Sequence, residues 1–300
     1  MKAPRNFLFW LAISGTALLG QQPGFLREGQ AFMRAGKMAE ALAVYEAELK
    51  AKPDSLAALN AAGVALDHLG RTAEARKYFL KLVELSPAGE AQARPWRQVA
   101  ISYAFDNQCD GAVEAEKKAY DIYTAKGDAY MQGEMWNEAA RVCIEAGQFQ
   151  RALQLYEEGT KAGLAEKGIQ PERVALWRFR LAHARARVAA REGNKQQAWQ
   201  YVAEAKQILD SNAEMAKQQA IFYPYLEGYV ALYTGDLDRA IAQLRLANQN
   251  DAFIQCLLGD ALERAGKPEE ARELYKKAAG NYGHNPPAAY ARWFTKKKLL

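Results

Sequence analysis

The nine residues RAGKMAEAL (34–42) decide the fold, because variants of this stretch recur along most of the chain. Each copy has a glycine, four variable residues and then an alanine, and in one copy asparagine replaces the glycine. The pairs are Gly36/Ala41, Gly70/Ala75, Asn107/Ala112, Gly147/Ala152, Gly193/Ala198, Gly235/Ala240 and Gly266/Ala271. A pattern that returns every few tens of residues indicates a repeat protein rather than a chain with one compact core.

The spacing within each copy fits a turn between two antiparallel helices. Glycine, and less readily asparagine, tolerates the left-handed backbone conformation that ends a helix. Five residues later the second helix has begun, and an alanine there lets it lie close to the first. A small residue upstream of each turn should mark where the first helix approaches the second. These small residues are Gly29, Gly63, Ala100, Ala140, Ala186, Gly228 and Gly259.

The fuller pattern resembles the tetratricopeptide repeat (TPR), in proteins of the bacterial exported type. The first copy carries it as Gly29, Phe32, Gly36, Ala41, Tyr45 and Pro53. The resemblance implies an all-α fold, a right-handed superhelical solenoid of about seven antiparallel hairpins. The expected hairpins span about 22–55, 56–89, 93–126, 133–166, 171–210, 213–250 and 251–285. Residues 286–300 are expected to form a C-terminal capping helix with a basic tail.

The first residues differ from the rest of the chain. Lys2 and Arg5 give a positive start, and the stretch from Phe7 to Gly20 carries no charge. This arrangement is typical of a secretory signal peptide. We therefore expect residues 1–21 to be a signal peptide, or an N-terminal membrane anchor if they are not cleaved, with a buried N-terminal helix as the third possibility. The expected location is the periplasm or the cell envelope.

The cysteines give no sign of a disulfide framework, because Cys109, Cys143 and Cys256 are odd in number and scattered. Each falls in an expected helix, where a free cysteine usually behaves as a small buried hydrophobic residue. We expect three free thiols.

No motif for catalysis or for binding a metal or cofactor is present. His68, His183 and His284 have no partner at metal-ligand spacing, and the glycines do not cluster as in a phosphate-binding loop. We expect no enzyme activity, no metal and no cofactor.

The resemblance implies that the first helix of each hairpin lines the concave side of the solenoid. Arginines and one histidine recur at helical spacing on one such helix, and four aromatic residues recur on the next. The aromatic residues either pack between hairpins or form a basic and aromatic groove, and both interpretations stay open. Arginine suits carboxylates, and tyrosine offers contact area with a polar tip. The predicted partner-binding residues are Arg97, Asn137, Arg141, Arg180, His183, Arg187, Arg191, Phe222, Tyr225, Tyr229 and Tyr233.

Together these features predict a non-catalytic scaffold or adaptor of the cell envelope. The groove would hold a partner protein or peptide, with an acidic or C-terminal carboxylate segment, and only residues 1–21 would contact a membrane. One alternative is a module that binds an acidic polymer or nucleic acid, since residues 173–191 are rich in arginine. However, the 40 basic and 35 acidic residues are mixed along the chain, which is not typical of nucleic-acid binding. A second alternative is a regulatory subunit of an envelope enzyme.

Overall fold

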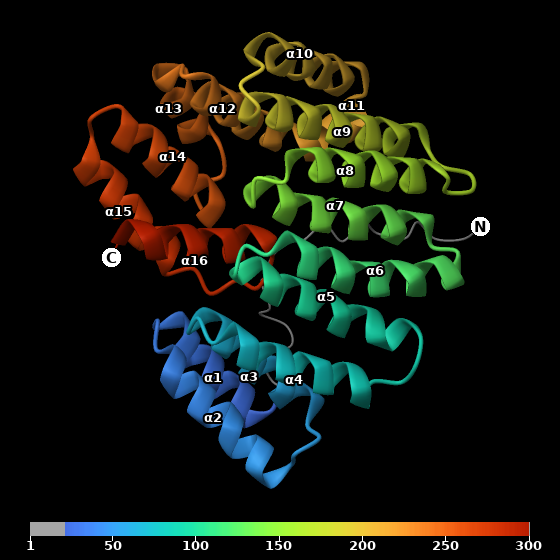
Figure 1. The fold of residues 1–300 in the computed structure, drawn as a ribbon, viewed down its shortest axis with the longest axis vertical. Helices are drawn as coiled ribbons and strands as arrows, with labels where there is room; N and C mark the ends of the chain where they lie inside the picture. The colour runs from blue at the N-terminus through green and yellow to red at the C-terminus, as the bar shows by residue number, and fades with distance from the viewer. Residues whose placement is uncertain (1–21, 300) are drawn as a thin grey trace.

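The computed structural model describes residues 22–299, and all of their regular structure is helical (Figure 1). The expected signal peptide or anchor, residues 1–21, lies outside the described residues. Seven helix pairs follow one another: α1 (Gly24–Arg34) with α2 (Met38–Ala51), α3 (Leu56–His68) with α4 (Thr72–Leu85), α5 (Glu90–Phe105) with α6 (Cys109–Lys126), α7 (Ala129–Glu145) with α8 (Phe149–Leu164), α9 (Pro171–Arg191) with α10 (Lys195–Ser211), α12 (Tyr223–Thr234) with α13 (Leu237–Leu246), and α14 (Ala252–Arg264) with α15 (Pro268–Ala279). The predicted all-α solenoid of about seven hairpins is confirmed.

Three further elements complete the described chain. A short helix α11 (Ala213–Gln219) and a 3-10 turn η1 (Ala220–Phe222) connect α10 to α12, and α16 (Pro286–Leu299) follows the last hairpin. The turns of the hairpins have the backbone conformation that the repeated stretch predicts, with positive φ at the glycine or asparagine of all seven copies. Asn107, with φ of 55°, is the one non-glycine residue in the described part of the chain with positive φ.

Large side chains of the second helix pack against the small residues that precede the turns. A Cβ atom added to Gly63 would lie 2.6 Å from the ring of Phe79, and one added to Gly29 would lie 2.2 Å from the ring of Tyr45. Both rings are almost fully buried. The glycines therefore let an aromatic ring pack directly against the backbone of the first helix.

Replacement of one of these glycines tests this packing. Helix propensity favours alanine over glycine by about 1 kcal/mol, whereas overpacking a core costs about 1–3 kcal/mol. Because the Phe79 ring is fully buried and has no room to shift, we expect Gly63→Ala to lower the free energy of unfolding by up to about 2 kcal/mol. Urea titration monitored by circular dichroism measures the change. A second change, Phe79→Leu, should make Gly63→Ala less harmful than it is alone, and equal effects in both backgrounds would contradict the contact.

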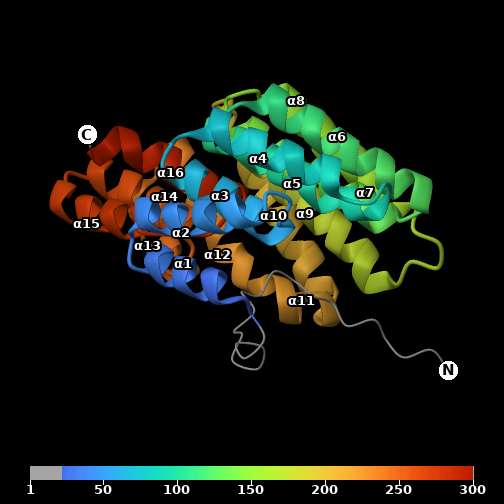
Figure 2. The same cartoon turned by 90° about the horizontal axis from the view of Figure 1, so that it is seen from below.

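The hairpins stack side by side along a curved path, and α16 lies across the interior of the curve (Figures 1 and 2). It packs against α14 and α15 next to it in sequence, and against α5 and α7 from the other half of the chain. Ala289 is fully buried in a cluster with Ile101, Phe105 and Val142. The last helix therefore joins the two halves of the solenoid.

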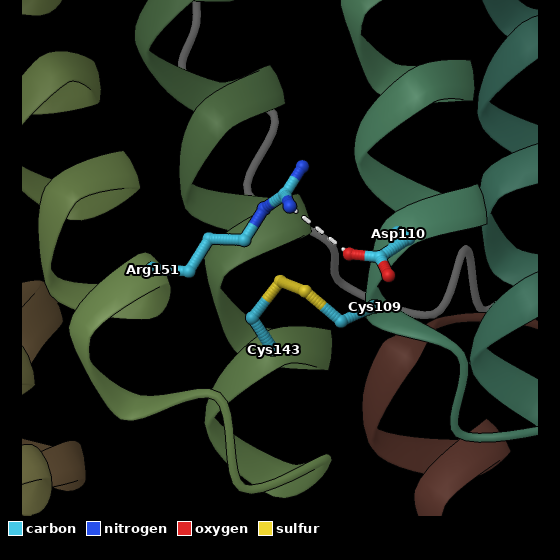
Figure 3. The surroundings of a disulfide bond; sticks show 4 residues. All are labelled: Cys109, Asp110, Cys143 and Arg151. Atoms are coloured by element: carbon cyan, nitrogen blue, oxygen red, sulfur yellow. Dashed lines mark hydrogen bonds and ion pairs between the residues drawn. A yellow bond between two sulfur atoms is a disulfide. The ribbon is translucent and has the colours of Figure 1, made fainter.

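The expectation of three free thiols is wrong, because Cys109 and Cys143 form a disulfide bond (Figure 3). Cys109 begins α6 and Cys143 lies in the last turn of α7, with their Cα atoms 4.6 Å apart. The two cysteines are 34 residues apart in sequence, about one repeat, and stacking brings them together. Cys256 is free and buried, as expected.

Candidate functional site

The structure divides the predicted binding residues into a buried set and a more accessible set. The buried residues are His183, Arg187, Tyr225 and Tyr229. The accessible set consists of Arg141, which is exposed, and of Arg97, Asn137, Arg180, Arg191, Phe222 and Tyr233, which are partly exposed. The stripe of arginines on α9 therefore runs from a partly open end at Arg180 into the interior.

Three of the buried residues and the partly exposed Arg191 meet in a polar cluster with two further residues. We call it the arginine–tyrosine cluster: Glu145, Tyr156, Arg187, Arg191, Tyr225 and Tyr229. Arg187 donates from Nη2 to the hydroxyl of Tyr156 at 2.8 Å, and from Nη1 to that of Tyr225 at 3.3 Å. This guanidinium therefore links α8, α9 and α12.

The carboxylate of Glu145 lies at the centre of the arginine–tyrosine cluster. Arg191 donates from Nη1 to Glu145 Oε2 at 2.9 Å and to the hydroxyl of Tyr229 at 3.0 Å, and that hydroxyl donates to Glu145 Oε1 at 3.2 Å. Sequence analysis did not include Glu145 among the site residues, because a glutamate in the last turn of α7 looks like any solvated helix residue. Of the two interpretations of the aromatic residues, packing between hairpins therefore applies to Tyr225 and Tyr229, which are buried against α9.

Positive charge exceeds negative charge around this cluster. The charged groups that act on Tyr225 are the guanidinium groups of Arg187 and Arg141 and the carboxylate of Glu145. Burial raises the pKa of Tyr225 to about 12, against the opposing effect of the two arginines. Burial lowers the pKa of His183, and Arg187 and Arg141 lower it further, so this imidazole is neutral at pH 7.

The accessible residues at the open end form what we call the entry surface: Arg97, Asn137, Arg141, Arg180 and Phe222. Two of its arginines are paired within the chain. Arg97 donates from Nε to Glu138 at 3.0 Å, and Arg180 forms an ion pair with Glu134. Arg141 is exposed and takes part in none of the ion pairs between described residues. The entry surface thus offers one exposed guanidinium that forms no ion pair among the described residues, although its charge acts on the carboxylate of Asp251.

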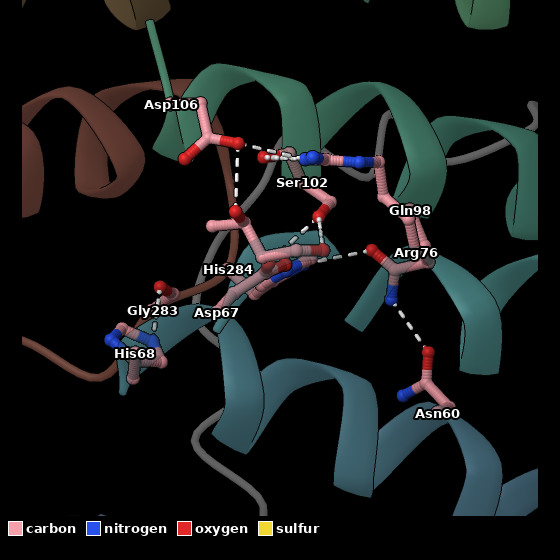
Figure 4. A network of polar contacts seen from close by, with 10 residues as sticks. Asn60, Asp67, His68, Arg76, Gln98, Ser102, Asp106, Gly283 and His284 are labelled. Carbon is pink, nitrogen blue, oxygen red and sulfur yellow. Dashed lines mark hydrogen bonds and ion pairs between the residues drawn. The ribbon is translucent and has the colours of Figure 1, made fainter. Parts of the chain in front are cut away.

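A second polar network was not predicted, and it joins opposite ends of the chain (Figure 4). His284, which follows α15 in a non-helical segment, places Nε2 at 2.8 Å from Asp67 Oδ2 on α3 and Nδ1 at 3.0 Å from Gln98 Oε1 on α5. Ser102 donates to the other oxygen of Asp67 at 2.7 Å. Sequence analysis missed this network because His284 and Asp67 are 217 residues apart.

Within residues 22–299, no three His, Cys, Asp or Glu side chains come together in a way that could hold a metal ion. None of the helices described between these residues is both long enough and apolar enough to cross a membrane.

The fold and its repeated turn define a class of protein, the solenoids built from helical hairpins. Two segments, residues 26–90 and 225–286, match the family model described as tetratricopeptide repeat. No curated protein matches the sequence. Together with the architecture, this match identifies the chain as a tetratricopeptide-repeat protein.

Solved structures share this fold at low sequence identity. Aspartyl phosphate phosphatase F from Bacillus subtilis is 12% identical with a TM-score of 0.56, and the match covers 85% of this chain and 68% of that one. The apo form of RapI is 15% identical with a TM-score of 0.50, and the match covers 91% of this chain and 98% of that one. A tetratricopeptide repeat protein from Parabacteroides merdae is 14% identical with a TM-score of 0.47, and the match covers 92% of this chain and 98% of that one. At these identities the likeness concerns the fold.

Proposed function

We propose that this protein is a non-catalytic scaffold that holds an acidic or C-terminal carboxylate segment of a partner protein at its entry surface. The TPR fold is a protein–protein interaction scaffold, which supports the general role. The observation that carries the finer proposal is Arg141, an exposed guanidinium without an ion pair among the described residues. A guanidinium can bind a carboxylate through two parallel hydrogen bonds.

Charges of both signs surround Arg141, namely the guanidinium of Arg187 and the carboxylate of Asp251, on which Arg141 acts. Arg187 lies behind Arg141 and adds a second positive charge in the interior, where charges are screened less than at the surface. Asn137 is one turn away on α7, but its side-chain oxygen is buried, so the recognition falls to Arg141.

The arginines of α9 give less support to an acidic polymer or nucleic acid as the ligand. Most of them are engaged within the chain, in the pairs Arg173–Glu166, Arg180–Glu134, Arg185–Glu157 and Arg191–Glu145. A surface that binds nucleic acid needs several free cations along a stripe. The alternating ion pairs of α9 fit a local site for one carboxylate better.

We also propose that the protein acts outside the cytoplasm, in the periplasm or the envelope. The charged start and uncharged run of residues 2–20 support export, and the Cys109–Cys143 disulfide supports an oxidising compartment. If residues 1–21 are retained after export, they anchor the solenoid to the membrane. Immunoblotting of fractionated cells tests this proposal, and recovery of the protein in the cytoplasm contradicts it.

Charge reversal at Arg141 tests the entry surface. We expect Arg141→Glu to reduce capture of partner proteins from an envelope extract by at least about tenfold, because a charged hydrogen bond is lost and a repulsion replaces it. Affinity purification followed by quantitative mass spectrometry measures the change. Because Arg141 is exposed, the helical content and melting temperature should stay unchanged.

The matched control is Arg178→Glu, which makes the same charge change at another exposed arginine, on α9. Partners that disappear with Arg141→Glu but remain with Arg178→Glu are those bound at the entry surface. If both variants lose the same partners, the attraction depends on net charge alone and the entry surface is the wrong site.

A further inference from the structure

Residues 280–285 lie in a site built by the other end of the chain. The segment leaves α15 and reaches α3 and α5 before α16 begins (Figures 1 and 4). The carbonyl oxygen of Gly283 lies 3.1 Å from Nε2 of His68. The segment is therefore recognised through its backbone as well as through the side chain of His284, as an extended peptide is recognised by a binding groove.

Both ring nitrogens of His284 have a hydrogen-bond partner. Gln98 donates from Nε2 to Asn60 at 2.7 Å, which turns its Oε1 toward His284 as an acceptor. Asp67 also offers an acceptor, so both ring nitrogens of His284 face oxygen atoms.

The remaining walls of the site are aromatic. The His284 ring stacks on Phe105, with centroids 5.3 Å apart, and lies 5.5 Å from Phe79. Asp67 itself is completely buried. Burial raises the pKa of its carboxyl, and the hydrogen bonds and charge of His284 oppose that rise. Without His284 the buried carboxylate of Asp67 would lose one hydrogen-bond partner and keep Ser102, and an unsatisfied buried acceptor is costly.

These contacts differ from those that a cap of a solenoid needs. A cap covers apolar surface, and Ala289, Tyr290 and Ala291 of α16 already do so. A polar site that surrounds one imidazole adds chemical selectivity that coverage does not require. We propose that α3 and α5 form a binding site for an extended glycine–histidine segment, that residues 280–299 fill it as an intramolecular ligand, and that a partner segment with the same pair displaces them.

The proposal gives the chain a closed state, in which its own C-terminal segment occupies the inner side, and an open state that accepts a partner. The site at Asp67 is built on α3 and α5, whereas Arg141, which carries the proposed function, lies on α7. A failure of one proposal therefore leaves the other intact, since the tests use different variants and different ligands.

The first test uses a fluorescein-labelled synthetic peptide that copies residues 280–295, added to the full chain. The wild-type protein should bind it weakly, because its own segment fills the site. The variant His284→Ala should bind it at least about tenfold more tightly, and the same peptide carrying His284→Ala should lose that gain. Fluorescence anisotropy gives the dissociation constants.

Two further full-length variants serve as comparisons. Arg292→Ala removes the hydrogen bond from Nε to the carbonyl oxygen of His68 at 3.0 Å, and should also increase peptide binding while His284 remains. Tyr282→Ala changes an exposed side chain of the same segment and should behave as the wild type. Equal peptide binding by wild type and His284→Ala, or equal binding of both peptides, would overturn the proposal.

A second measurement needs no variant. In hydrogen exchange of the wild-type protein, the amides of residues 288–295 in α16 should exchange at least about tenfold faster than those of residues 99–104 in α5, because a displaceable segment opens before the hairpins do. If both sets exchange at one rate, the segment opens only with the whole fold. It is then a fixed part of the solenoid, and the proposal is wrong.

Discussion

Reduction of the Cys109–Cys143 disulfide is expected to destabilise the protein by about 3–4 kcal/mol, since the bond closes a loop of 34 residues. The bond constrains the unfolded chain, and in the native state it ties α6 to α7. Both sulfur atoms belong to largely buried cysteines, so the reduced thiols would remain packed in the same place. The loss should therefore come from the unfolded state more than from altered packing.

Urea titration with and without reductant measures this effect, and peptide mapping without reduction shows the bond itself. The double variant Cys109→Ala with Cys143→Ala should match the reduced wild type and should not respond to reductant. Cys256→Ala is the control, because Cys256 is free and buried, and this variant should keep the full response. Protein isolated from the envelope with both thiols free would contradict the disulfide.

The sequence predicted the local structure because the turn of each hairpin depends on neighbouring residues. Asn107 shows this well: its alignment with six glycines predicted a left-handed turn, and its φ is 55°. The disulfide could not be predicted in this way, since it depends on how α6 stacks on α7. Cysteines about one repeat apart are the signal that could have indicated it.

The candidate site was harder to predict because helical periodicity identifies a face but not what covers it. Arg180 and Arg187 share one stripe of α9, yet Arg180 is partly exposed and Arg187 is buried. The difference comes from α12, which packs against α9 and places the hydroxyl of Tyr225 next to Arg187. The return of α16 to α5 depends on the curved stacking of the hairpins. The contact between His284 and Asp67 could therefore not be predicted from the local sequence.

Removal of the Glu145 carboxylate is expected to have a large effect on stability. Glu145→Ala removes the carboxylate that accepts a hydrogen bond from the partly buried Arg191. It also removes the negative charge that compensates Arg187. Loss of one partner from a buried ion pair costs about 3–5 kcal/mol. Burial raises the pKa of Glu145, and Arg191 and Arg187 oppose that rise.

The matched control is Glu157→Ala, which removes the glutamate of the exposed pair with Arg185. An exposed pair contributes about 0–1 kcal/mol, so urea titration should separate the two variants clearly. Similar losses would show that the arginine–tyrosine cluster does not hold α7, α9 and α12 together. The expected difference also bears on function, because Arg141 lies one turn before Glu145 on α7. The buried carboxylate therefore fixes the helix that presents the exposed guanidinium, and Glu145→Ala should weaken partner capture without changing the entry surface itself.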